Sequence, residues 1–272
     1  MDFFIESGSR SLRETSVRRP PTSAGGLPCT QGRVLRAEGL DSAGAVEAER
    51  NLRDIARINR WFGGHRTLIR LLQRSVRPQD RFTILDVGAA SGDMGQCVQK
   101  RFPNAKVVSS DRRPIHLKTA NMPRVAADAF ALPFQDGSFD FVMCSSFLHH
   151  FSNGEVLDLL RAMRRLARRS VIVLDLERHP FAYSFLPLTR GLFRWSELTV
   201  HDGCASVEAA FRHSELESAA LAQGPVRATI HRHWPWFRLS IVLDGLETIQ
   251  MPSKPIIGRG SHELRGSLYP TR

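Results

Sequence analysis

The 272-residue chain has little cysteine, and its four cysteines lie far apart in the sequence. Cys29, Cys97, Cys144 and Cys204 form no CxxC pair, so neither a zinc-binding spacing nor a disulfide framework is indicated. Unpaired, scattered cysteines are typical of a reducing compartment. We therefore expect a cytoplasmic protein with no metal site and no disulfide bonds.

Long apolar runs are also missing. No stretch approaches the roughly 18 consecutive apolar residues that a membrane-spanning helix needs. The N-terminal segment has no apolar core and no small-residue cleavage signal, so a secretory signal peptide is not expected. With 42% hydrophobic and 24% charged residues, the composition is that of an ordinary globular protein.

Acidic residues are outnumbered by basic ones, with 27 Asp and Glu against 38 Lys and Arg and a net charge of +11. Such an excess suits nucleic acid, an anionic membrane or an anionic substrate. The basic residues form no single long block, however. A short cluster, Arg164, Arg165, Arg168 and Arg169, falls at a predicted helix end, where cations complement the helix dipole. The preferred interpretation is a charge spread over solvated helix faces.

The chain divides into three parts by composition. Residues 1–43 are rich in Ser, Arg, Pro and Gly with few clustered apolar residues, which predicts a disordered extension. Apolar residues then recur every three or four positions over 44–78, which predicts a helical N-terminal cap within a domain spanning 44–248. Residues 249–272 are predicted to be an irregular tail.

Strand and helix patterns alternate through this predicted domain. Apolar strands are predicted over 82–87, 105–109, 139–144 and 170–175, and helices over 93–101 and 153–167. Such alternation predicts an α/β fold, doubly wound, with a mostly parallel Rossmann-like sheet and helices on both faces. Two short helices, near 206–211 and 214–222, and two strands, near 228–234 and 236–243, are predicted to follow.

The strongest local pattern is Ile84-Leu85-Asp86-Val87-Gly88-Ala89-Ala90-Ser91-Gly92-Asp93. An apolar strand runs into small residues and then into a helix. In open α/β sheets, ligands bind where strands end, and small residues let the backbone approach the ligand closely. The dinucleotide fingerprint GxGxxG is absent, which argues against a nicotinamide-dependent dehydrogenase.

Further polar residues follow the next strands. Asp111 ends the second strand, where a carboxylate can accept two hydrogen bonds from the vicinal diol of a ribose. The segment Val125-Ala126-Ala127-Asp128-Ala129-Phe130 precedes another strand, which ends in Ser145-Ser146-Phe147-Leu148-His149-His150. The order and spacing of these groups make a chance occurrence improbable.

Residues 80–175 together resemble the class I S-adenosylmethionine (SAM)-dependent methyltransferases of the small-molecule type, and are similar to the ubiquinone and menaquinone C-methyltransferase group. The resemblance implies S-adenosyl-L-methionine as cofactor. The loop from Asp86 would hold its methionine part, Asp111 its ribose, and Asp128 with the Ala129 N–H its adenine. Ala90 stands where this motif often has a glycine. The implied cofactor-binding residues are Asp86, Gly88, Ala90, Gly92, Asp111, Asp128, Ala129 and Ser145.

The expected reaction is methyl transfer to an O or C atom of a small aromatic, quinone-like or polyketide-type metabolite. An RNA methyltransferase is the alternative suggested by the charge, but the sequence has no RNA-binding module and no Asn-Pro-Pro-Tyr-type motif. A SAM-binding protein without methyl transfer is a further alternative. The expected partner is therefore a small, aromatic or lipophilic acceptor rather than nucleic acid.

Two groups of residues are candidates for acid/base catalysis, because histidine suits proton transfer near neutral pH. His149 follows the fourth strand on the ligand side of the sheet. His201 and Asp202 form a second candidate pair, although Asp202-Gly203 is also typical of a turn. A packed structural histidine is the alternative for His149.

The segment 178–204 is predicted to be a lid, because its many aromatic residues suit an apolar acceptor pocket. A helix packed on the core is one alternative, and a weak contact with an anionic membrane surface is another. On the opposite side, Arg53, Asn59 and His65 are polar candidates in the N-terminal helices, for which a solvated helix face is the preferred interpretation.

Overall fold

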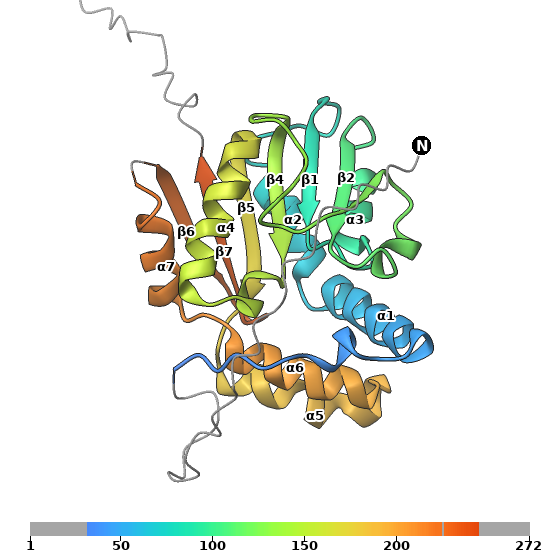
Figure 1. The fold of residues 1–272 in the computed structure, drawn as a ribbon. Coiled ribbons are helices and arrows are strands. Elements are labelled where there is room, and N and C mark those ends of the chain that lie inside the picture. The colour runs from blue at the N-terminus through green and yellow to red at the C-terminus, as the bar shows by residue number, and fades with distance from the viewer. Residues whose placement is uncertain (1–31, 225, 245–272) are drawn as a thin grey trace, which may run out of the picture.

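The computed structural model describes residues 32–224 and 226–244, and its centre is one seven-stranded sheet of order β3-β2-β1-β4-β5-β7-β6 (Figure 1). Strands β1 to β5 are parallel, and the last two strands pair antiparallel. The predicted α/β fold with a doubly wound, mostly parallel sheet is confirmed. The strands are β1 (Thr83–Val87), β2 (Lys106–Asp111), β3 (Arg124–Ala126), β4 (Phe139–Ser145), β5 (Ala167–Leu176), β6 (Arg227–His233) and β7 (Arg238–Asp244).

Helices cover both faces of the sheet because its central strands are apolar on both sides. Leu85, Val142 and Val171 face one cluster, while Ile84, Phe141 and Ile172 face the other. The first face carries α4 (Asn153–Leu166) and α7 (His213–Leu221), and the second carries α2 (Gly64–Leu72) and α3 (Asp93–Arg101). The alternation of side chains along a strand explains this division.

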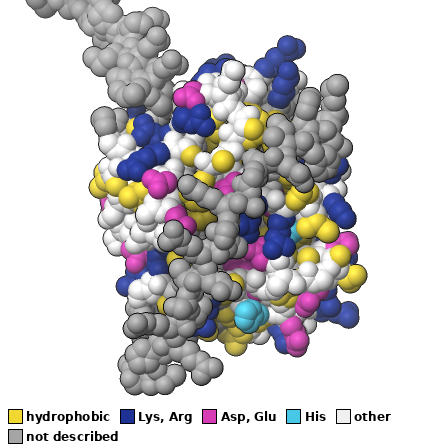
Figure 2. All heavy atoms as spheres, in the orientation of Figure 1, with side chains coloured by type: hydrophobic (Ala, Val, Ile, Leu, Met, Phe, Trp, Pro, Cys, Tyr) yellow, Lys and Arg dark blue, Asp and Glu magenta, His cyan; other side chains and the backbone are white. Residues whose placement is uncertain are grey.

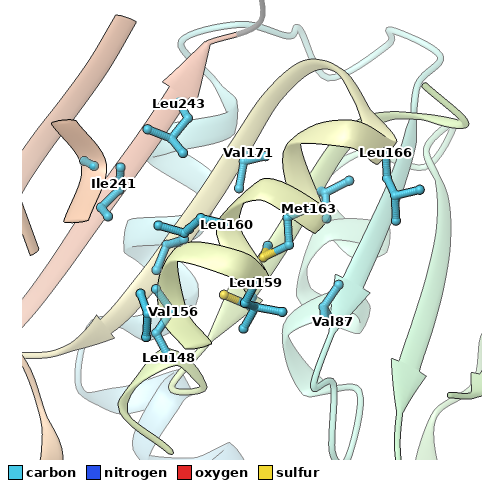
Figure 3. Packing of buried hydrophobic residues seen from close by; sticks show 14 of the residues in the cluster. Val87, Leu148, Val156, Leu159, Leu160, Met163, Leu166, Val171, Ile241 and Leu243 are labelled. Atoms are coloured by element: carbon cyan, nitrogen blue, oxygen red, sulfur yellow. The ribbon is translucent and has the colours of Figure 1, made fainter. Parts of the chain in front are cut away.

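Helix α4 shows how local sequence and core packing agree. Ser152 and Glu155 form a capping box that satisfies backbone N–H groups at the start of the helix. Val156, Leu160 and Met163 then follow at three- and four-residue spacing and are fully buried against the sheet (Figure 3). This packing fixes the end of β4, from which several candidate site residues project.

Three helices, α1 (Ala45–Trp61), α5 (Pro180–Phe193) and α6 (Glu197–Ala209), lie across the carboxyl edge of the sheet (Figure 1). The segment 178–204, predicted to be a lid, forms α5 and more than half of α6. The expected turn at Asp202-Gly203 is wrong, because these residues lie inside α6. Ser196 caps the start of that helix, since its side chain accepts the Thr199 N–H.

The expectation of disorder up to residue 43 is wrong for residues 32–43. This segment contains a short 3-10 helix, η2 (Gly39–Asp41), and packs against α6. Polar contacts order it in place of an apolar core: the Asp202 carboxylate accepts the backbone N–H groups of Gly39 and Leu40 at 2.8 and 2.9 Å. The expectations for residues 1–31 and for the tail at 249–272 lie outside the described residues.

In the view of Figure 2, Lys and Arg side chains are scattered among hydrophobic and acidic ones and form no continuous basic stripe. This agrees with a charge spread over solvated surfaces.

Within the described part of the chain, no helix has the length and apolar character needed to cross a membrane.

Candidate cofactor and acceptor site

The loop between β1 and α3 is a tight turn that depends on small residues. Gly88, Ala90 and Gly92 all have positive φ angles, of 68°, 45° and 71°. A Cβ at Gly88 would lie only 2.3 Å from Cδ2 of Phe147. Ala90 adopts the left-handed backbone in which glycine carries no steric cost, which explains why a glycine is often found at this point of the motif.

Asp86 lies within β1, directly before this loop, and its side chain is fully buried. Burial, with the nearby charge of Asp93 as a smaller effect, raises the pKa of Asp86 well above its usual value. Its Oδ2 atom has no hydrogen-bond partner among the described residues. An unpartnered buried carboxyl oxygen next to a small-residue turn suits a polar ligand group.

Asp111, at the end of β2, joins that strand to the loop. Its carboxylate accepts the backbone N–H of Ala90 at 3.0 Å and that of Arg113 at 2.9 Å. Burial acts to raise the pKa of Asp111, but hydrogen bonds, foremost one with His116, outweigh burial and lower that pKa. Asp111 is therefore a carboxylate at neutral pH.

The adjoining strands bring the other predicted cofactor residues to the same edge. The Ala127 N–H donates to the Asp111 carbonyl at 3.1 Å, which places the segment with Asp128 and Ala129 beside β2. The Asp128 carboxylate accepts the N–H of Phe130 at 2.9 Å. At the end of β4, the Ser145 hydroxyl is buried without a partner in the described part of the chain.

Three phenylalanines form a wall beside these residues. The rings of Phe147 and Phe151 are 5.0 Å apart, and those of Phe151 and Phe130 are 5.4 Å apart. Phe130 keeps 41% of its surface exposed. An apolar wall with an exposed ring next to Asp128 suits a flat heterocycle, because aromatic rings prefer offset or edge-to-face contact.

Arg238, which the sequence analysis missed, is a deeply buried cation at this edge, with 2% of its surface exposed. Its guanidinium donates to the Asn59 side chain at 3.0 Å, the Phe62 carbonyl at 3.3 Å and Ser146 Oγ at 3.5 Å. Among the described residues these partners are all neutral oxygens. Burial lowers the pKa of Arg238 to about 10, so it remains a cation at neutral pH.

A second cation, His65, lies beside the first residue of α3. Its Nε2 atom is 2.8 Å from Asp93 Oδ2, and Asn59 donates to the same oxygen at 3.1 Å. Burial acts to lower the pKa of His65, but hydrogen bonds to Asp93 and Cys97 outweigh it and raise the pKa to about 9. Asn59 and His65 are thus parts of a polar network rather than of a solvated helix face.

Aromatic side chains from α5 and from the turn between β6 and β7 surround Phe62, next to this network. The ring of Phe62 contacts Phe185 at 4.7 Å, Phe193 at 5.5 Å and Trp236 at 6.1 Å, each edge to face. The carbonyl of the same Phe62 accepts the bond from Arg238. An apolar aromatic cluster therefore adjoins a buried cation at the end of the sheet.

His149 lies in a short 3-10 helix, η4 (Leu148–His150), and is 2% exposed. Its Nδ1 atom is 2.7 Å from Asp175 Oδ1, and its Nε2 atom is 3.7 Å from Glu38 Oε1. Burial alone would lower its pKa, but the two carboxylates raise the pKa of His149 to about 10. A histidine that is cationic at neutral pH donates a proton rather than accepting one, which does not suit a general base.

His201 and Asp202 lie on α6. The His201 side chain is 72% exposed, with Nδ1 3.0 Å from Asp202 Oδ1. Asp202 is buried and binds the backbone of residues 39 and 40. Its contacts give it a structural task, the attachment of the N-terminal segment, and the acid/base role of the pair stays a prediction.

The fold and the ligand edge together define a Rossmann-like domain with a small-residue loop after β1 and carboxylates at the end of β2 and after β3. Residues 84–170 match the family described as "Methyltransferase domain". A stretch of 81 residues is 36% identical to a demethylmenaquinone methyltransferase of Thermus thermophilus, spanning 26% of this chain and 37% of that protein. The chain thus matches little more than a third of the length of this relative.

Solved structures agree in fold. The plantazolicin methyltransferases BamL and BpumL, each in complex with a desmethylPZN analog and SAH, superpose with TM-scores of 0.58 and sequence identities of 11% and 15%. In both cases the match covers 76% of this chain and 93% of the other. Residues 84–170 thus match a methyltransferase domain, and the surrounding fold is similar to that of these SAH-bound methyltransferases.

The network around Asp93 gives a first prediction. Replacing Asp93 by Asn removes the carboxylate that stabilises the imidazolium of His65, so the pKa of that ring falls from about 9 towards its ordinary value. NMR titration of the His65 ring protons measures this midpoint. Asp158→Asn, an exposed change on α4, serves as the matched control and leaves it unchanged. An unshifted midpoint in Asp93→Asn would contradict the assignment.

Proposed function

We propose that the chain is a SAM-dependent methyltransferase that transfers a methyl group to an O or C atom of a small aromatic, quinone-like or polyketide-type acceptor. When bound, SAM supplies a methyl group activated on a sulfonium. The loop of Gly88, Ala90 and Gly92, with the unpartnered oxygens of Asp86 and Ser145, fits such a ligand. Asp111 and Asp128 would hold its ribose and adenine.

The buried guanidinium of Arg238 carries the proposal for the acceptor. Among the described residues, no carboxylate bonds to this cation, so an anionic or readily ionised ligand group would pair with it. A phenol or hydroquinone placed there would have its pKa lowered, because a nearby positive charge favours the phenolate. The phenolate is the form that attacks a methyl group through its oxygen or a ring carbon.

The surroundings of Arg238 support an aromatic acceptor in particular. The rings of Phe62, Phe185 and Trp236 adjoin it and provide the apolar lining typical of small-molecule sites. Helices α1, α5 and α6 cover this edge and would exclude water from the reacting atoms (Figure 1). In this proposal the chain's own contribution is to orient the acceptor and to stabilise its anion.

Ligand binding provides the second prediction. Titration calorimetry with the full chain is expected to detect SAM binding and no NADH binding. Asp111→Asn should weaken SAM binding by about tenfold or more, because the neutral amide loses one of two acceptors for a ribose diol. The exposed change Asp158→Asn should leave affinity unchanged. A folded chain that binds NADH and not SAM would refute the proposal.

Turnover provides the third prediction. With methyl-labelled SAM and a panel of phenols and hydroquinones, Arg238→Met should lower kcat by about tenfold or more at neutral pH. The loss should shrink as the pH approaches about 10, where a phenol ionises unaided. Arg238→Lys, which keeps a cation, should retain more activity at neutral pH. SAM affinity measured in parallel separates this effect from donor binding.

Unchanged kcat in Arg238→Met would contradict the assigned role of this residue. Transfer of label to RNA and to none of the small molecules would favour the RNA methyltransferase instead. SAM binding without transfer to any acceptor would favour a binding protein.

The exposed apolar face of helix α5 supports the proposal that the acceptor is lipophilic and is taken from a membrane surface. Phe181, Leu188 and Leu192 are 68%, 81% and 79% exposed, and the spacing of seven and four residues places them on one face of the helix. Arg190 and Arg194 lie beside them in the sequence. An exposed apolar face flanked by cations suits shallow insertion among anionic lipids.

The fourth prediction tests this face with vesicles. The chain should co-sediment with vesicles containing phosphatidylserine more than with neutral phosphatidylcholine vesicles. The double change Leu188→Asp and Leu192→Asp should abolish this difference, whereas Leu221→Asp, an exposed leucine on α7, should not. Equal co-sedimentation of the double variant and the original chain would exclude α5 as the contact.

A further inference from the structure

Three metal-ligating side chains meet where the N-terminal segment crosses the end of β4. Glu38 Oε1 is 3.7 Å from His149 Nε2 and 3.9 Å from His150 Nδ1. One ligand atom from each of these three residues lies within 4.8 Å of the other two. The three residues come from two segments far apart in the sequence, so no local spacing marked them as a metal site, although His149 was a candidate for acid/base catalysis.

The His149 ring is oriented as a metal-ligating histidine is. Its Nδ1 atom lies 2.7 Å from the fully buried carboxylate of Asp175, and its backbone N–H donates to the other oxygen of that carboxylate at 3.2 Å. Histidines that bind metals nearly always use the second ring nitrogen in this way, which fixes the ring and increases its basicity. The remaining Nε2 atom is buried and has no hydrogen-bond partner in the described chain.

The Glu38 carboxylate accepts a hydrogen bond from the Ser206 hydroxyl, and the chain on either side of Glu38 is also held in place. Before it, Arg33 donates to the carbonyls of Ala209 at 2.7 Å and Phe151 at 2.9 Å. After it, Gly39 and Leu40 are bound by Asp202, as described above. The segment therefore presents Glu38 to the two histidines as part of the folded structure and not as a freely moving side chain.

From this geometry we propose that Glu38, His149 and His150 bind one divalent transition-metal ion of the zinc type. Imidazole and carboxylate are ligands that such ions prefer, and three protein ligands leave a fourth tetrahedral position for water or a substrate oxygen. Ligand atoms around a tetrahedral zinc lie about 3.3 Å apart, given bonds of about 2.0 Å. The distances between the three ligand atoms would have to shorten by roughly an ångström to reach this spacing. The ion takes the place of a proton on His149.

If this ion binds, it attaches residues 32–41 to η4, and this attachment lies beside the candidate acceptor site. The ion joins the N-terminal segment to η4, which follows directly from the strand that carries Ser145. This proposal concerns metal binding alone and does not depend on methyl transfer, so its test needs neither SAM nor an acceptor.

The test is a titration of the chelator-treated full chain with Co²⁺, followed by visible d–d absorption. About one Co²⁺ per chain should bind, without the charge-transfer absorption of a thiolate ligand, and Zn²⁺ should displace it. Glu38→Gln and His150→Ala should each weaken binding by about tenfold or more. His213→Ala, which removes a partly exposed histidine on α7, should bind like the original chain.

A second measurement guards against misfolded variants. Zn²⁺ should raise the thermal midpoint of the original chain and of His213→Ala, and should do so much less for Glu38→Gln, because a ligand stabilises the state that binds it. Circular dichroism confirms that each variant is folded. Absence of d–d absorption at stoichiometric Co²⁺, or equal affinity in Glu38→Gln and the original chain, would show that the three residues are an ion cluster only.

Discussion

Charged groups buried at the carboxyl edge of the sheet are the constraint on which the rest of this structure depends. Asp111, Asp175 and Arg238 lie there with little or no access to water. A charge out of water is costly unless hydrogen bonds or opposite charges compensate it. Backbone N–H groups compensate Asp111, His149 compensates Asp175, and oxygens of Asn59 and Phe62 compensate Arg238.

The compensation differs between the two sides of the edge. On the side of β2, Asp111 receives backbone N–H groups from Ala90 and Arg113, which fixes the cofactor loop. On the side of β5 and β7, Asp175 holds His149, and Arg238 bonds to neutral oxygens. The first arrangement fixes the small-residue loop that we propose binds SAM, and the second leaves a cation beside aromatic rings.

Much of the fold could be predicted from the sequence, as could the meeting of the predicted cofactor-binding residues at one sheet edge, because both are encoded locally. The role of these residues in binding SAM stays a prediction. The apolar strands, the glycine loop and the acidic residues that end successive strands occur within residues 80–175, and parallel strands bring their carboxyl ends together by geometry. The short strand β3 escaped prediction because three residues carry too little periodicity. The N-terminal segment was misjudged because polar contacts order it.

The sequence by itself thus determined the sheet, its mostly parallel strands and the small-residue turn of residues 88–92, since each depends on neighbouring residues. Only the tertiary structure decided what faces them. Glu38 and His149 are more than a hundred residues apart, as are Asn59 and Arg238, and no local pattern relates them. They meet because the segment before α1 and the antiparallel strand β7 both reach the same sheet edge, where burial makes their charges and partners matter.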